Sequence, residues 1–248
     1  MVNIAYFDCY SGASGDLLLA AVLDKAVCFE WFLKELRKLS IFNDTIEIEK
    51  SYVKRNSINS CKINIKINSH DHSHRNYKDI CNIIESSQIE EKAKVLSKKI
   101  FLNIAKAEAT VHNTTIEEIH FHEVGAIDSI IDIVGFSICY SSLNIDKCIV
   151  SPLPTGSGTI KCAHGNLPVP APATLEILKN SILIINNNDK IKEECLTPTG
   201  AGILSTIVDE CSYISKIDNI ENIGYGAGDK TFDKEITSNL RFITASNN

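Results

Sequence analysis

Apolar residues recur at helical spacing along much of the chain. The clearest example lies in 89–111, where Ile89, Leu96, Ile100 and Ile104 fall on one stripe of a helix. Asn113 follows this stripe and suits a helix C-terminus. The same spacing predicts further helices over 17–27, 29–39, 77–86, 127–138, 174–179 and 203–208.

Alternating apolar and polar residues predict strands between these helices. Over 60–67, apolar side chains at odd positions alternate with polar ones, which predicts a half-buried strand paired with 45–53 in an antiparallel hairpin. Shorter apolar runs predict strands at 2–7, 147–150, 182–185 and 240–244. This mixture predicts an α+β (mixed α/β) fold: a single soluble domain over 1–248 with a mixed sheet, helices and long Gly/Pro-rich loops.

The glycines are concentrated in a few loops and in the helix over 127–138, and none lies between Gly15 and Gly125. Three loops, 11–16, 155–158 and 197–202, combine glycine with hydroxyl side chains, and the first and third lead into predicted helices. Backbone N–H groups in such loops bind anions. We expect the three loops to converge on one anionic ligand; tight turns without a ligand are the alternative.

The candidate ligand-binding residues in these loops are Ser11, Ser14, Asp16, Thr155, Gly156, Ser157, Thr197, Thr199 and Gly200. The first loop lacks the Gly-Lys-Ser/Thr ending of a Walker A motif. Asp8 and Asp16 flank it and could instead hold a metal, or Asp16 could simply cap the helix.

The stretch 120–132 gathers metal-ligating side chains: His120, His122, Glu123, Asp128 and Asp132. The two histidines would point to one face of an extended backbone. The two aspartates lie one helical turn apart, on a stripe roughly 120° from the isoleucine face, so we expect both to flank the core. Imidazole and carboxylate together suit a borderline divalent cation such as nickel, zinc or cobalt. A capped helix with solvated acids and buried histidines is the alternative.

A second histidine group, His70, His72 and His74, alternates with polar residues after the predicted strand 60–67. This pattern is typical of a segment that collects metal ions, although a flexible polar loop has the same composition. We expect a role in metal capture or delivery.

Composition narrows the function classes. A formal net charge of −6 argues against a protein that binds nucleic acid through bulk electrostatics. The nine cysteines form no Cys-x-x-Cys pair, and no basic leader precedes the first apolar run, so we expect reduced thiols in the cytoplasm. No apolar run approaches the roughly 20 residues of a membrane helix.

Several motifs occur together in order: the segment 7–16, the histidine tract, 120–126, 152–158, 162–165, 168–174, 197–200 and 223–228. Together they resemble the LarC family of nickel insertion proteins, which make the nickel pincer cofactor of lactate racemase. The resemblance extends over about 2–243, and the histidine tract is shorter than is common in the family.

The resemblance implies a lyase-type cyclometallase that inserts nickel into pyridinium-3,5-bisthiocarboxylic acid mononucleotide. Two Ni–S bonds and one Ni–C bond would form, and CTP, with Mn or Mg, would be hydrolysed to CMP and pyrophosphate. Family chains continue into a C-terminal region associated with CTP. We therefore expect residues 1–248 to be the N-terminal portion, with the C-terminal portion as a separate partner chain and a homo-oligomer as a further expectation.

In this reading His70, His72 and His74 collect nickel. His120, His122, Glu123 and Asp128 form the insertion site, and Asp132 is a nickel ligand or orients the histidines. One of these groups would accept the proton lost from the pyridinium ring. Two rivals are a non-catalytic nickel carrier or storage protein, and a metal-dependent phosphohydrolase built on Asp8 and Asp16.

Overall fold

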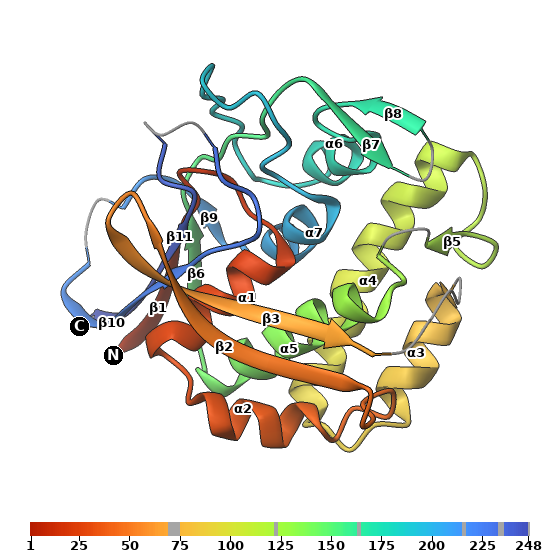
Figure 1. Ribbon diagram of the computed structural model, residues 1–248, viewed down its shortest axis with the longest axis horizontal. Coiled ribbons are helices and arrows are strands. Elements are labelled where there is room, and N and C mark those ends of the chain that lie inside the picture. Colours follow the sequence, from red (N-terminus) through yellow and green to blue (C-terminus); the bar gives the residue numbers. More distant parts are fainter. Residues whose placement is uncertain (69–74, 122–123, 163–164, 215–216, 233–235, 248) are drawn as a thin grey trace.

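A mixed sheet forms one side of the molecule in the computed structural model, which describes residues 1–68, 75–121, 124–162, 165–214, 217–232 and 236–247 (Figure 1). Its strands are β1 (Val2–Asp8), β2 (Ile46–Arg55), β3 (Ile58–Ile67), β6 (Lys147–Val150), β9 (Glu210–Cys211), β10 (Asn219–Gly226) and β11 (Leu240–Asn247). They lie in the order β2-β3-β10-β11-β1-β6-β9. Because β1 is antiparallel to β11 and parallel to β6, the predicted mixed sheet is confirmed.

Two small two-stranded sheets complete the described strands. β4 (Arg75–Asn76) pairs with β5 (His120–Phe121), and β7 (Thr159–Cys162) pairs with β8 (Gly165–Pro168). In the large sheet, the predicted hairpin of β2 and β3 is confirmed, with Ile46 opposite Ile67. Asn56 and Ser57 join these strands, both at positive φ, as a two-residue hairpin turn requires.

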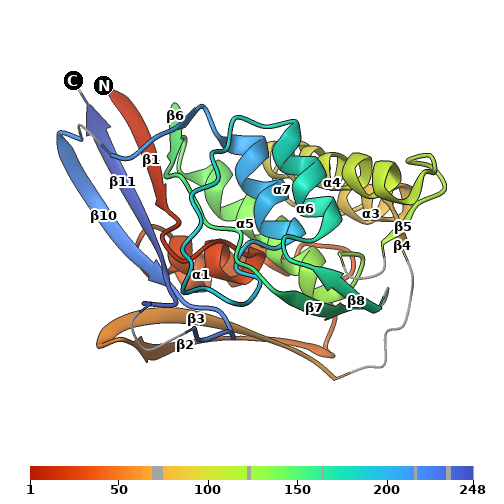
Figure 2. The same cartoon turned by 90° about the horizontal axis from the view of Figure 1, so that it is seen from above.

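The helices cover one face of the strands β10, β11, β1 and β6 (Figure 2). They are α1 (Gly15–Lys25), α2 (Phe29–Leu36), α3 (Tyr77–Glu85), α4 (Glu91–His112), α5 (Ile127–Ser142), α6 (Pro172–Lys179) and α7 (Pro198–Ile207). The mixed α/β fold class predicted from the sequence is therefore confirmed. No helix within the described ranges has the length and apolar character that a membrane span requires.

Helix α1 is fixed at the centre of the core, which determines where its N-terminus lies. Leu18, Leu19 and Leu23 are fully buried between the sheet and α5. A Cβ on Gly224 would lie 2.2 Å from the Ala21 carbonyl oxygen, so α1 and β10 pack at backbone contact. The glycines of 223–228 therefore serve this close packing of helix on strand.

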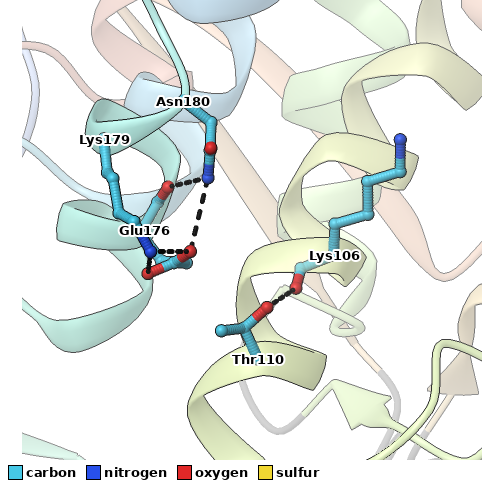
Figure 3. A network of polar contacts seen from close by, with 5 residues as sticks. All are labelled: Lys106, Thr110, Glu176, Lys179 and Asn180. Atoms are coloured by element: carbon cyan, nitrogen blue, oxygen red, sulfur yellow. Dashed lines mark hydrogen bonds and ion pairs between the residues drawn. The ribbon is translucent and has the colours of Figure 1, made fainter.

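Helices α4 and α6 pack side by side at the far side of the core. In Figure 3, Thr110 Oγ1 donates to the Lys106 carbonyl oxygen within α4 (2.9 Å), and Lys179 Nζ pairs with Glu176 within α6 (3.1 Å). The polar contacts drawn there stay within each helix or its C-cap. Ile177 of α6 is buried in the core, so burial of apolar surface helps to hold α6 in place.

One predicted strand is wrong. Residues 182–185 form a single bridge, between Leu153 and Ile185. The Ile184 N–H donates to the Cys211 Sγ atom of β9 (3.2 Å), so this amide is not available for a strand ladder. The apolar run has the composition of a strand, but it lies beside a two-residue edge strand that offers no ladder to extend.

Three parts of the chain differ from the prediction based on local spacing. Strand β10 and the hairpin β7–β8 are not predicted from the sequence, because glycine and proline interrupt their alternation. Helix α7 begins at Pro198, before the predicted start at 203. Thr197 Oγ1 accepts a hydrogen bond from the Gly200 N–H (3.1 Å), and this cap with proline in the first turn starts the helix despite its glycines.

Helix α3 depends on a capping box that can be tested directly. Asn76 Oδ1 accepts from the Asp79 N–H (2.9 Å), and Asp79 Oδ2 accepts from the Asn76 N–H (3.0 Å). We expect Asn76→Ala to lower the free energy of unfolding by about 1 kcal/mol in urea denaturation. Asn82→Ala, on the exposed side of the same helix, is the control and should cost nothing, since alanine is the better helix former. Equal costs for both variants would contradict the role of the cap.

Candidate functional site

A cavity of about 510 Å³ opens beside the N-terminus of α1, a size suited to a small organic ligand. Its walls come from β3, the first turns of α1 and α5, and loops around 194–197 and 228–238. These segments are far apart in the sequence, so the fold assembles the cavity. We call it the first cavity.

Backbone hydrogen bonds join two of the three predicted ligand loops at this cavity. The Ala13 N–H donates to the Cys195 carbonyl oxygen (2.8 Å), and the Thr197 N–H donates to the Ala13 carbonyl oxygen (3.1 Å). Gly12 has φ +92°, and a Cβ there would lie 2.0 Å from the Cys195 oxygen. The segments 11–16 and 194–197 therefore meet at backbone contact, and the predicted loop 197–202 begins at this contact.

The predicted binding residues of these two loops divide into lining and supporting groups. Ser11, Ser14, Asp16 and Thr197 line the first cavity. The structure places Thr199 and Gly200 behind them. The methyl group of Thr199 lies 2.9 Å from the position of a Cβ on Gly15, and Gly200 packs on the Ala13 carbonyl.

The third loop lies behind the cavity and supports its wall. The Thr155 carbonyl oxygen accepts from the Cys195 N–H (3.2 Å), and Ser157 Oγ donates to the Ile191 carbonyl oxygen (2.9 Å). Thr155 is fully buried, and Gly156 forms a bridge with Glu194. Thr155, Gly156 and Ser157 are absent from the residues that line the first cavity, so only two of the three loops border it.

The charge of the first cavity is negative. Its lining carries five carboxylates against two lysines. Lys230 pairs with Glu194 (3.3 Å), Lys66 pairs with Glu49 outside the lining (2.9 Å), and Lys62 of β3 pairs with Asp229 (2.5 Å). The remaining lining carboxylates are Asp16, Asp128 and Asp132. This balance favours a metal ion or a ligand with a cationic part, while the N–H groups at the start of α1 still suit an anionic group.

Asp132 is the most constrained of these acids. It lies against Gly15, where a Cβ would come within 2.8 Å of the Asp132 Cβ, so the absence of a side chain at Gly15 makes this approach possible. Within the described residues, Asp132 Oδ1 is sealed from solvent and has no hydrogen-bond partner. Burial raises the pKa of this carboxyl well above its ordinary value, and the charges of Asp16, Asp128 and Asp229 raise the pKa further.

Asp128 lies one turn earlier on α5 and differs from Asp132. Its side chain is exposed to the cavity, and its Oδ1 accepts a hydrogen bond from the Ser129 N–H (2.7 Å). The expectation that both aspartates flank the core therefore holds for Asp132 alone. Asp16 Oδ1 accepts from Ser14 Oγ, which fixes the acid at the first turn of α1.

His120 is exposed on β5, opposite Asn76 of β4, and is not among the lining residues of the first cavity. Near it, Arg75 Nη1 donates to the Gly125 carbonyl oxygen (3.0 Å). The other predicted histidines and glutamate, His70, His72, His74, His122 and Glu123, lie outside the described residues. Among the described residues, no three histidine, cysteine, aspartate or glutamate side chains form a group that could hold a metal ion.

Sequence reasoning missed part of the lining. Asn64 and Lys66 of β3 and Asp229 and Lys230 after β10 all contribute to the first cavity. Strand β3 was interpreted as structure alone, because alternation shows which face is polar but not what that face meets. Asp229 directly follows the glycine-rich segment 224–228, and this position was the available signal.

Asp8 does not share this cavity. It pairs with Arg241 (2.5 Å) and lines a different cavity, at the end of β1. Asp8 and Asp16 therefore lie in two separate cavities, and this arrangement does not favour the phosphohydrolase built on both.

Comparisons with known proteins give one consistent result. A family model described as nickel insertion protein matches residues 5–248. Proteins named pyridinium-3,5-bisthiocarboxylic acid mononucleotide nickel insertion protein are similar to the chain: one from Acetivibrio thermocellus is 45% identical over 92% of this chain and 57% of its own length. One from Clostridium kluyveri is 44% identical over 97% of this chain and 61% of its own length. The chain thus spans about three-fifths of these relatives, and no solved structure matches it.

Proposed function

The chain belongs to the nickel insertion protein family, and from this membership we propose that it inserts nickel into pyridinium-3,5-bisthiocarboxylic acid mononucleotide. The observation that carries the proposal is the first cavity, which combines Asp16, Asp128 and Asp132 with a helix N-terminus. The substrate of the named relatives carries a cationic ring and a phosphate, and nickel is a second, cationic substrate. A cavity with carboxylates for the cations and backbone N–H groups for the phosphate suits both substrates.

We propose that the phosphate of the mononucleotide substrate binds at the start of α1. The N–H groups of the first turn, Ser14 Oγ and the Thr197 side chain border the cavity at this point. The aspartates Asp16, Asp128 and Asp132 then face the cationic ring and nickel. His120, His122 and Glu123 would deliver or bind nickel, and His70, His72 and His74 would collect it.

We assign Asp132 the proton that is lost when the Ni–C bond forms. Metallation replaces the ring C–H bond by a Ni–C bond, so one proton must leave the carbon. A carboxylate whose pKa is raised by burial holds a proton well, and Asp132 has this property. Ni²⁺ supplies the new bonding partner, and the atoms and charge balance when the carboxylate becomes a carboxylic acid.

We place the use of CTP with Mn or Mg in the part of the family protein that this chain does not span. The chain would then act with that part as a partner, as a cytoplasmic lyase whose product serves lactate racemase. These assignments follow from the family resemblance, and they concern the activity of the full-length family protein.

The test is an insertion assay with the purified chain, Ni²⁺ and the mononucleotide substrate. CTP and the remaining part of the Clostridium kluyveri relative are added or omitted. Mass spectrometry follows the replacement of protons by nickel in the product. We expect Ser14→Ala to reduce product at least about tenfold while Ni²⁺ binding stays unchanged, because it removes a contact to the substrate.

Ser142→Ala, at the opposite end of α5, is the matched control and should leave the assay unchanged. A nickel carrier or storage protein would bind Ni²⁺ and give no product in any combination. That outcome would overturn the proposed insertion.

A further inference from the structure

A second cavity, of about 430 Å³, lies outside the carboxyl ends of β1 and β6. These strands are parallel neighbours, and Asp8 ends β1 while Ser151 follows β6. Both residues line the cavity. In open sheets, ligands bind at the carboxyl ends of parallel strands, so the position is one where binding sites form.

Two tyrosines at this cavity leave most of their surface exposed. Tyr10 is 58% exposed and Tyr213 is 61% exposed, and both belong to its lining. Tyr10 stands in the tight turn that Gly12 closes by donating its N–H to the Cys9 carbonyl oxygen (2.9 Å). The Tyr213 hydroxyl accepts from Asn186 Nδ2 (2.7 Å), which holds its ring in place. Exposed aromatic faces beside a cavity are surfaces on which planar rings stack.

The polar part of the second cavity is already ordered by internal hydrogen bonds. Asn187 Oδ1 accepts from both the N–H and the Oγ1 of Thr155 (2.8 and 3.0 Å), and Ser151 Oγ accepts from the Cys9 N–H (2.9 Å). The run 186–188 consists of asparagines, whose amides both donate and accept hydrogen bonds. Such amides match the edges of nitrogen heterocycles.

The charges at this cavity balance, in contrast to the first. Asp8 is paired with Arg241 (2.5 Å), and Asp189 lines the cavity together with Lys190. The net charge of this cavity therefore selects only weakly between ligands. Stacking and hydrogen bonding are the interactions that would distinguish one ligand from another.

We propose that the second cavity binds the planar heteroaromatic ring of a nucleotide, stacked on Tyr10 and Tyr213 with its edge on the asparagines of 186–188. The 9–14 turn contributes to both cavities, because Tyr10 lines the second cavity and Ser11 and Ser14 line the first. Binding at the second cavity goes beyond the proposed insertion activity and stands on different residues.

The test is isothermal titration of the full chain with three probes: CMP, nicotinate mononucleotide and ribose 5-phosphate. The first two carry a pyrimidine or a pyridinium ring, and the third has no ring base. We expect at least one nucleotide to bind at least tenfold more tightly than ribose 5-phosphate. Tyr10→Ala and Tyr213→Ala should each weaken that nucleotide about 5- to 150-fold, the effect of removing one stacking partner.

Two controls locate the site. Tyr52→Ala removes an exposed tyrosine of β2 and should change nothing. Asp16→Asn alters the first cavity and should leave the affinity that depends on Tyr10 and Tyr213 unchanged. The probe whose affinity depends on the tyrosines identifies the ring class. The proposal is overturned if no nucleotide binds, if ribose 5-phosphate binds equally well, or if Asp16→Asn removes the binding and the tyrosine variants do not.

Discussion

Replacement of Asp132 by asparagine is expected to make the ligand-free protein more stable and the insertion reaction at least about 100-fold slower. The stability gain arises because an ionised carboxylate is costly to bury when one oxygen is sealed from solvent and has no partner among the described residues. Removing the ionisable group should raise the melting temperature by roughly 3 to 10 °C at pH values above the folded-state pKa, since an unsatisfied buried group costs about 1–3 kcal/mol. The rate falls because an amide cannot accept the proton from the ring carbon.

The sign of the pH dependence follows from the raised pKa. The folded protein binds the Asp132 proton more tightly than the unfolded chain does, so protonation stabilises the wild type in acid. This stabilisation is fully present below the ordinary aspartate pKa of about 3.9 and is lost as the pH rises through the folded-state pKa. The advantage of asparagine should therefore grow over the same interval and level off above it.

Scanning calorimetry of both proteins over a pH series, without metal, measures this effect independently of activity. Asp128→Asn is the matched control, because Asp128 lines the same cavity on the same helix but is exposed. Its melting temperature should change little. If both variants shift the melting temperature equally, the burial of Asp132 is not the cause.

Replacement of Gly12 by alanine is expected to lower the free energy of unfolding by about 4 kcal/mol or more. Gly12 has φ +92°, which strains any L side chain, and its Cβ would lie 2.0 Å from the Cys195 carbonyl oxygen. The two segments that form one wall of the first cavity would have to separate. Ligand binding should weaken together with stability.

Alanine substitutions at two other glycines distinguish the cost of backbone strain from the cost of a steric clash. Gly165 has φ +93° with nothing within 4 Å of a Cβ, so Gly165→Ala should cost only about 1 kcal/mol. Gly158 has φ +96° and would bring its Cβ within 2.8 Å of the Lys192 carbonyl oxygen. Urea denaturation should rank the costs Gly165, Gly158 and Gly12 in rising order. If Gly12→Ala and Gly165→Ala lower the free energy of unfolding equally, the two segments of the cavity wall can separate without an energetic cost.

The sequence predicts well those elements whose signal is local. The stripe of 89–111 became α4, and the alternation of 60–67 became β3, because periodic burial within one element leaves a period in the sequence. The strand predicted at 182–185 is wrong because its formation depends on a distant partner and not on a local signal. Its composition suits a strand, but a strand forms only where a neighbouring strand offers unpaired backbone N–H and C=O groups. For 182–185 the neighbour is β9, which is distant in the sequence.

The candidate site shows the same division. Ser14, Asp16 and Asp132 were recognised because small loops and helical spacing mark them locally. Lys66 and Asp229 were missed, since only the assembled fold brings β3 and the segment after β10 to the start of α1. The third loop, 155–158, shares the composition of the other two, but composition does not show that it lies one layer behind them.

The position of β11 also has a consequence for how the protein folds during synthesis. This strand lies between β10 and β1 and pairs Asn247 with Val2, so the middle of the sheet joins opposite ends of the sequence. Contacts of such long sequence separation form slowly, because closing a large loop costs entropy before any contact repays it. On the ribosome, β1 must wait with its β11 edge unpaired until residues 240–247 have emerged. We expect this stage to be the one at which the nascent chain depends most on chaperones.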